Sequence, residues 1–302
     1  MPPSSPHIRV ERARPLLGTR VAIRCDAPNA QQANAAIDAA FDAIAQIHAL
    51  MSFQDAASDV SRLNREASQN PVQVHPHTYR VLKCAQQLAA DSDGVFDVSV
   101  AGQLCAWGLL PEIAGAPRAS ETASWRDIDL LDGRHVHFRQ PLCIDLSGIA
   151  KGYAVDSAIA ALQNAGIAEA CVNAGGDLRL IGADRERIAL RSCRSDDTHA
   201  PMLELDNAAV ASSCGYPQRQ LHQGRWLGPH LRGDRREPVD PEISASVIAP
   251  QCMLADALTK LVLADATLAA ALLSQHEALA YRHHPAHGWQ AIGDTPPPII
   301  LH

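Results

Sequence analysis

The sequence lacks a surplus of basic residues. Its 302 residues contain 26 Lys and Arg against 33 Asp and Glu, which gives a formal net charge of -7 at pH 7. Binding along a nucleic acid requires a basic surface that neutralises phosphates. We therefore expect no nucleic-acid partner, although a small anionic ligand held locally is compatible with this charge.

The sequence also lacks a long apolar run and any clustered cysteines. Residues 1–15 carry charges and prolines where a secretory signal would be apolar, and no later run approaches the length of a membrane span. The eight cysteines are scattered without a CxxC pair, which is typical of small buried residues in a reducing compartment rather than of disulfides or a zinc site. These absences predict a cytoplasmic protein, although a chain trimmed of an export signal would look the same.

The composition is that of a globular chain. Hydrophobic residues make up 47% and charged residues 20%, which is ample material for a core. No Gly/Ser-rich or Pro-rich run divides the sequence cleanly. We expect a single domain over residues 1–302, built of two intimately packed lobes whose boundary the sequence does not locate.

Hydrophobic periodicity predicts helices and strands without a regular βαβ alternation. Helices are expected around 37–50, 81–88, 151–164 and 255–263, and strands at 19–25, 135–147, 169–173, 177–182, 187–193 and 243–249. The tail from residue 281 resembles an irregular or edge segment. Because strands often follow strands, the pattern favours an α+β sheet with helices packed on one side over a doubly wound parallel sheet.

The stretch IDLSGIAKGYAVD (144–156) is chemically dense. An apolar strand ends at Asp145, passes Ser147 and Gly148, and enters a helix that carries Lys151. Such a turn directs backbone N–H groups and a helix N-terminus toward an anion, and a lysine in the first turn adds positive charge. The GxxxxGK[ST] spacing of a Walker loop is absent, and a plain strand-turn-helix is about equally compatible with this stretch alone.

Four other stretches are ambiguous when taken alone. VNAGGDLRLIG (172–182) predicts a tight turn with open amides, and GVFDVSVAGQLCAWGL (94–109) suits a planar heterocycle or ribose, although a core is commoner. MSFQDAASDVSRLNRE (51–66) is a polar loop after a helix. In ADALTKLVL (255–263), Asp256, Thr259 and Lys260 share one helical face, as either an ordinary salt bridge or a metal site.

Together and in this order, the stretches resemble the ApbE-type FAD:protein FMN transferases. The resemblance covers nearly the whole chain and includes LGT (17–19), MSF and DVSRLN, GVFDVSV and WG, DLSGIAKGYAVD, NAGGDLR, ASSCGY (211–216), His230 in PHLRGD, and SASVIAPQCMLADALTK. DLSGIAKGYAVD followed by NAGGD is the most specific part. The resemblance implies an α+β, T-fold-like architecture with FAD in a cleft between two lobes.

It also implies an enzyme that splits FAD at its pyrophosphate. FMN would pass through a phosphoester to a Thr or Ser of an acceptor protein, AMP would leave, and Mg²⁺ would bind the phosphates. His230 matches the general base for the acceptor hydroxyl, and Gly148, Asp256 and Thr259 match metal-binding positions. The flavin-contacting positions of the family match Leu17, Phe53, Val95, Phe96, Asp97, Asp145, Lys151 and Arg232.

The sequence departs from the family near the expected metal and acceptor. Lys260 stands where the family has an oxygen ligand, and a protonated ammonium would repel Mg²⁺. The loop after His230 reads GDRREP (233–238), and Ser213-Cys214 replaces SG. Three hypotheses follow: a Mg²⁺-dependent transferase with Lys260 turned aside or neutral, an FAD-binding protein without transfer in which Lys260 stands in for the cation, and an FAD pyrophosphatase in which water replaces the acceptor hydroxyl.

Overall fold

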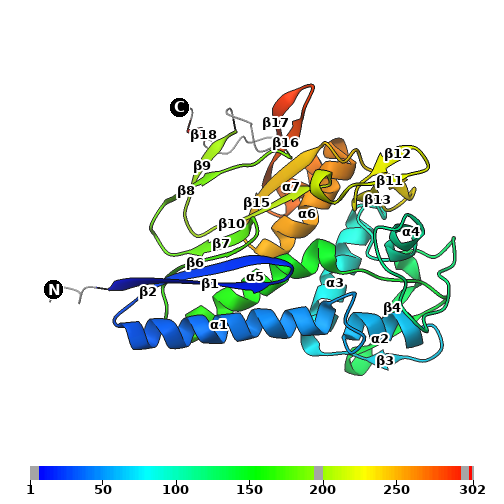
Figure 1. Cartoon of the computed structure of the whole chain (residues 1–302), viewed down its shortest axis with the longest axis horizontal. Coiled ribbons are helices and arrows are strands. Elements are labelled where there is room, and N and C mark those ends of the chain that lie inside the picture. The colour runs from blue at the N-terminus through cyan, green and yellow to red at the C-terminus, as the bar shows by residue number, and fades with distance from the viewer. Residues whose placement is uncertain (1–6, 194–199, 294–298, 301–302) are drawn as a thin grey trace.

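The computed structural model describes residues 7–193, 200–293 and 299–300 (Figure 1). Within these residues the largest sheet has eight strands in the order β1-β2-β6-β7-β10-β15-β16-β17, and every neighbouring pair is antiparallel. The strands are β1 (Ile8–Leu16), β2 (Thr19–Ala27), β6 (Glu169–Ala174), β7 (Asp177–Ile181), β10 (Ala209–Cys214), β15 (Ser244–Ala249), β16 (Leu279–His284) and β17 (Gly288–Ile292).

Helices cover one face of this sheet. They are α1 (Ala30–Met51), α5 (Ser147–Asn164), α6 (Cys252–Ala264) and α7 (Ala266–Gln275). In α1, Ile37, Phe41, Ile44 and Ile47 recur at helical spacing and are all buried, so one apolar stripe faces the sheet. The side chain of Asn29 caps this helix by accepting a 2.9 Å hydrogen bond from the amide of Gln32.

A smaller sheet covers the opposite face. It consists of β8 (Glu186–Ala189), β9 (Met202–Leu205) and β18 (Ile299–Ile300), and Leu203 of β9 packs against Leu178 and Leu180 of β7. Because side chains alternate along a strand, Asp177 and Arg179 of β7 point to the helical face instead, where both pair with residues of α5. This alternation places a carboxylate of the sheet beside the N-terminal half of α5.

The remaining elements gather beyond the C-terminal end of α1 (Figure 1). They are α2 (Asp59–Glu66), α3 (Pro76–Asp91), α4 (Ala101–Ala106), a sheet of β3 (Val72–Gln73), β5 (His135–Phe138) and β4 (Ile128–Leu131), and the hairpins β11 (Gln220–His222) with β12 (Arg225–Leu227) and β13 (Leu231–Arg232) with β14 (Glu237–Pro238). None of the helices in the described ranges is both long and apolar enough to cross a bilayer.

The predicted α+β class with helices on one side is confirmed, one segment prediction is wrong, and the prediction of an irregular or edge tail holds only for its edge strand. Residues 135–147 do not form one strand: β5 ends at Phe138, and the backbone of Ile144 bonds to the side chain of Asn64 instead of to a strand. The tail is regular up to Ile292, because β16 lies inside the large sheet and only β17 is at its edge. Residues 294–298 and 301–302 of this tail lie outside the described residues.

Candidate functional site

The loop before α5 is held by a side chain that the sequence did not mark as functional. Asn64 of α2 donates a 2.9 Å hydrogen bond to the carbonyl of Ile144 and accepts a 2.8 Å bond from its amide. On the same helix, the hydroxyl of Ser61 donates a 3.1 Å bond to the carbonyl of Phe53. The DVSRLN stretch therefore holds Phe53 and the backbone of Ile144, which lie at the expected flavin site. In the sequence, only the match of this stretch to the family pattern indicated such a role.

Asp145 links the strand-to-helix turn to the FD stretch. Its amide donates a 2.9 Å hydrogen bond to the carbonyl of Val98, and its carboxylate accepts bonds from the amide and the hydroxyl of Ser147. Desolvation raises the pKa of Asp145. Ser147 is the first residue of α5, so the carboxylate of Asp145 occupies one amide at the helix N-terminus, while the N-cap residue Leu146 makes no side-chain capping bond.

The FD stretch is packed against the altered loop after His230. Val95 and Phe96 are buried, and the amide of Gly233 donates a 3.0 Å bond to the carbonyl of Val95. A Cβ atom at Gly233 would overlap the carbonyl oxygen of Gly94, so no larger residue fits there without movement. The GDRREP loop thus has a specific packing partner.

Asp97 is neutralised by an arginine that the sequence analysis did not select. Its carboxylate accepts hydrogen bonds from the amides of Ser99 and Trp125, and Nη2 of Arg236 lies 3.1 Å from its Oδ2. Burial raises the pKa of Asp97, and the guanidinium of Arg236 opposes this shift. The predicted Arg232 instead pairs with Asp234 and Asp265, each at 2.8 Å.

Leu17 lies at the tip of the β1–β2 hairpin. It adopts φ +54°, and Gly18 follows at φ +69°, as a two-residue turn between antiparallel strands requires. The next residue, Thr19, packs on the glycine turn of NAGGD, where a Cβ atom at Gly175 would overlap it. The tip lines an open depression of about 660 Å³ formed by residues 13–20 and His48, which contains no other predicted flavin residue.

A buried cluster of charges lies where α5, α6, β7 and β10 meet. Nζ of Lys151 is 2.8 Å from Oδ2 of Asp177, and Lys260 donates to Oδ1 of Asp256. The other oxygen of Asp256 accepts a 3.0 Å bond from the amide of Gly152. Lys260 also donates to the hydroxyl of Ser213 at 3.0 Å. The structure thus brings Lys151 and Asp256 together, as expected, and adds Asp177 and Ser213.

The cluster depends on a close approach of two helices. A Cβ atom at Gly152 would overlap the carbonyl oxygen of Cys252, the first residue of α6. The second glycine of GIAKG is therefore required for packing, because only a hydrogen side chain allows the backbones to approach this closely.

Burial and neighbouring charges shift the ionisation of this cluster. Desolvation, with the nearby charge of Asp256, raises the pKa of Asp177 to about 6. Desolvation opposes ionisation of Asp256 as well, but Lys260 and Lys151 hold its pKa below the usual value. The pKa of Lys151 is raised, because the attraction of Asp177 and Asp256 outweighs its own desolvation.

His230 lies close enough to feel the same charges. It is half-buried between β12 and β13, and it makes a backbone hydrogen bond with Cys214 at the end of β10. Desolvation and the ammonium groups of Lys260 and Lys151 lower the pKa of His230 to about 3. The imidazole is therefore neutral at physiological pH and able to accept a proton.

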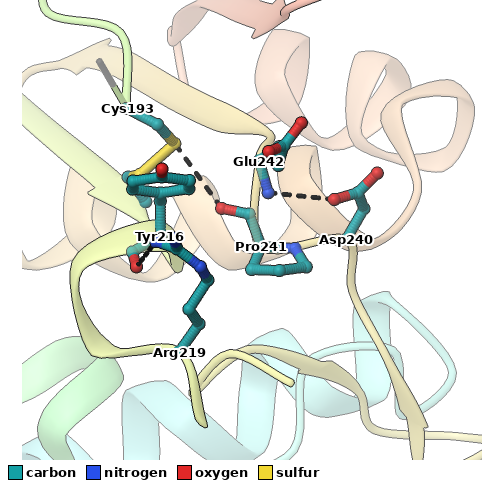
Figure 2. The surroundings of a disulfide bond; sticks show 7 residues. Cys193, Tyr216, Arg219, Asp240, Pro241 and Glu242 are labelled. Carbon is teal, nitrogen blue, oxygen red and sulfur yellow. Dashed lines mark hydrogen bonds between the residues drawn. A yellow bond between two sulfur atoms is a disulfide. The ribbon is translucent and has the colours of Figure 1, made fainter. Parts of the chain in front are cut away.

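Two cysteines beside the cluster form a disulfide, so the prediction that all eight are unpaired is wrong. Cys193 is bonded to Cys214, and Sγ of Cys193 lies 3.6 Å from the carbonyl oxygen of Pro241 (Figure 2). The pairing was hidden because the two residues are 21 positions apart and meet only through the sheet. Among the described residues the other six cysteines are unpaired, three of them buried and three half-buried.

The three residues predicted to bind a metal lie close together, but the side chain of Lys260 lies between them. Gly148, Asp256 and Thr259 surround Lys260, and a Cβ atom at Gly148 would lie 3.3 Å from its Cε. The described residues contain no group of three or more His, Cys, Asp or Glu side chains that could hold a metal ion. The expectation that Lys260 turns aside is wrong, and the oxygens present do not fit a divalent cation while the ammonium lies among them.

Fold and site together define an α+β protein in which a strand-to-helix turn lies beside two half-buried lysines, each paired with a buried carboxylate. The chain belongs to the ApbE family, because the model of that family matches residues 17–282. It is 30% identical to the FAD:protein FMN transferase of Vibrio cholerae over 67% of this chain and 64% of that protein. It is 28% identical to the FAD:protein FMN transferase of Chlamydia trachomatis over 82% of this chain and 78% of that protein.

Solved structures agree with the fold. The flavinyl transferase ApbE of Pseudomonas stutzeri superposes with a TM-score of 0.80 at 22% identity, over 95% of both chains. The ApbE protein of Thermotoga maritima gives a TM-score of 0.80 at 25% identity, over 94% of this chain and 97% of that one. The sequence match to the Vibrio cholerae relative covers slightly less than two thirds of that protein's length.

Proposed function

We propose that this chain is an FAD:protein FMN transferase. A hydroxyl oxygen of an acceptor Thr or Ser forms a bond to the FMN phosphorus of FAD, the pyrophosphate P–O bond breaks, and AMP leaves. Membership of the ApbE family supports this proposal, as do the relatives named for the same activity. The observation that carries it is the turn into α5, where the helix N-terminus lies beside the half-buried ammonium of Lys151, because amides and an ammonium together suit a pyrophosphate.

The flavin end of FAD would lie against the FD stretch. Val95, Phe96 and Phe53 are buried and would form an apolar floor behind the ring system, and Leu17 at the hairpin tip would contact it from another side. Asp97 and Asp145 would offer acceptors for its polar edges or for ribose. Arg232 would exchange an internal carboxylate partner for a phosphate, as a guanidinium readily does. The cleft between two lobes of a single domain remains part of this proposal.

His230 would remove the proton from the acceptor hydroxyl. It is neutral before substrate arrives, and the negative charge of bound phosphates would raise its pKa toward the range of an effective base. The proton moves from the acceptor oxygen to the imidazole as the new P–O bond forms. No observation on the described residues favours water over a protein hydroxyl as the acceptor.

The experiment that tests the function uses the full chain, FAD and an acceptor domain that carries a candidate Thr, each with Mg²⁺ or with EDTA. Transfer adds one FMN to the acceptor mass, makes the acceptor band fluorescent and releases an equal amount of AMP. Free FMN with AMP and an unmodified acceptor would establish the hydrolase instead. If FAD remains intact after incubation with each acceptor domain, the proposal is contradicted.

Localisation in the cytoplasm remains a prediction. The Cys193–Cys214 disulfide opposes the part of the argument that relied on unpaired cysteines, because disulfides are typical of oxidising compartments. FAD and an acceptor protein are the partners that the proposed reaction requires.

A further inference from the structure

The ammonium of Lys260 is fixed by three oxygen acceptors. It donates to Oδ1 of Asp256, to the backbone carbonyl of Asp256 at 3.0 Å and to the hydroxyl of Ser213 at 3.0 Å. An ammonium has three protons, so all of them have partners. Its aliphatic stem packs beside Gly148, and only 19% of the side chain is exposed.

The same oxygens form a closed chain of hydrogen bonds. Thr259 donates from its hydroxyl to the carbonyl of Asp256 at 2.6 Å, and its oxygen lies 2.7 Å from the hydroxyl of Ser213. The Ser213 proton therefore has Thr259 as its acceptor, while the Ser213 oxygen accepts from Lys260. Since Gly152 occupies the other oxygen of Asp256, the groups that resemble cation ligands are already paired.

Charge balance supports the same conclusion. Lys151 and Lys260 face the two buried carboxylates of Asp177 and Asp256, so the cluster is neutral as it stands. A divalent cation bound here would lie within a few ångströms of an ammonium in a poorly hydrated pocket, where repulsion amounts to several kcal/mol. An ammonium, by contrast, is a compact point charge, as a metal ion is, and the Lys260 proton now donated to Ser213 could pass to a phosphate.

We propose that Lys260 takes the place of the divalent cation in this protein, so that it binds a pyrophosphate ligand without Mg²⁺. The claim that the pyrophosphate ligand is FAD rests on the proposed function, whereas the claim that no divalent cation binds beside Lys260 does not. The sequence has three lysines, at 83, 151 and 260, and two of them meet in this cluster. Lys83, on the exposed side of α3, supplies a matched control.

The first test measures Mn²⁺ binding to the ligand-free full chain by electron paramagnetic resonance. Wild type and Lys83→Thr should show no saturable Mn²⁺ site, whereas Lys260→Thr should show one, because a hydroxyl replaces a repelling charge. A wild-type site that is lost in Asp256→Asn would overturn the proposal, and this arm requires no Lys260 variant. Equal Mn²⁺ affinity in wild type and Lys260→Thr would overturn it as well.

A second test measures the melting temperature with and without Mg²⁺ in place of the electron paramagnetic resonance signal of Mn²⁺. Lys260→Thr leaves the buried carboxylate of Asp256 without its cation, so its melting temperature should fall and then recover when Mg²⁺ is added. Wild type and Lys260→Arg, which keeps the charge, should not respond to Mg²⁺. A rise in the wild-type melting temperature with Mg²⁺, matched in Lys260→Thr, would contradict the proposal.

FAD titration, followed by flavin fluorescence, separates this inference from the proposed function. The affinity of wild type for FAD should be the same within about twofold in the presence of Mg²⁺ and of EDTA. Lys260→Met should weaken FAD binding about tenfold or more, because it removes one positive charge that would face the phosphates. Binding that is lost in EDTA would sink the inference and leave the transferase intact. Absence of FAD binding under both conditions would count against the proposed function, while the Mn²⁺ result would still stand.

Discussion

The backbone amide of Gly152 in α5 donates a 3.0 Å hydrogen bond to Oδ2 of Asp256 in α6. One bond thus joins the N-terminal half of α5 to the charged cluster, and it exists only because the two helices are in backbone contact at Cys252. The glycine and the carboxylate are 104 residues apart in the sequence. Their meeting places the N-terminus of α5, Lys151 and Lys260 around one small volume.

Gly152→Ala should separate these helices. The added methyl group overlaps the carbonyl of Cys252, which is backbone and cannot rotate away, so we expect a loss of about 2 to 4 kcal/mol in the free energy of unfolding. Urea denaturation measures this loss. Gly148→Ala is the comparison, because its methyl group would meet the flexible stem of Lys260, and its loss should be smaller. Equal stability of Gly152→Ala and wild type would show that α6 moves freely at this contact.

Asn64→Ala should damage the loop before Asp145. Both the amide and the carbonyl of Ile144 would lose a buried partner, which costs about 2 to 4 kcal/mol of stability in total. Chemical denaturation gives the stability, and an FAD titration reports any movement of Asp145. Glu66→Ala, an exposed change on the same helix, should have little effect on either. An Asn64 variant as stable as the Glu66 variant would refute the positioning role.

The depressed pKa of His230 predicts how stability depends on pH. An unfolded histidine takes up a proton as the pH falls through about 6.5, whereas the folded one resists until about 3, because of desolvation and the charges of Lys260 and Lys151, which outweigh that of Asp256. The unfolded state therefore binds more protons between these limits, and stability falls as the pH falls. The melting temperature of wild type should drop relative to His230→Gln between pH 7 and pH 4.5. A constant difference would mean that His230 titrates normally.

The disulfide should stabilise the end of β10. It closes a loop over a sequence separation of 21 residues, for which chain entropy predicts about 3 kcal/mol. Alkylation after denaturation without reductant should modify six cysteines, and alkylation after reduction by a dithiol should modify all eight. The Cys193→Ser, Cys214→Ser pair should melt earlier than wild type, whereas Cys84→Ser should not. Eight reactive cysteines before reduction would rule the bond out.

The bond also bears on His230. Cys214 precedes Gly215 and makes the backbone hydrogen bond with the imidazole (Figure 2 shows the surroundings of the bond). The double serine variant should therefore broaden or shift the imidazole proton signals of His230 in NMR spectra. Unchanged signals would mean that β10 keeps its position without the disulfide.

The sequence by itself determined the elements and the family. Local patterns are sufficient for this, because the spacing of Ile37, Phe41 and Ile44 specifies a buried helical stripe, and the glycines of NAGGD specify a turn, whatever surrounds them. Motif order then predicted that Asp145, Lys151 and Asp256 belong to one site. Side-chain spacing also placed Thr259 and Lys260 on the face of Asp256, as the structure confirms.

The tertiary structure alone decided what these residues do to one another. The carboxylate of Asp256 could have met a metal, a solvent-exposed lysine or a half-buried ammonium, and the choice depended on how far α6 approaches α5. The contacts of Asn64 and Arg236 and the Cys193–Cys214 bond could not be derived from local patterns for the same reason, since each joins segments that are distant in sequence. Pairing energies of charges depend on distance and hydration, and both are properties of the packed molecule rather than of the chain.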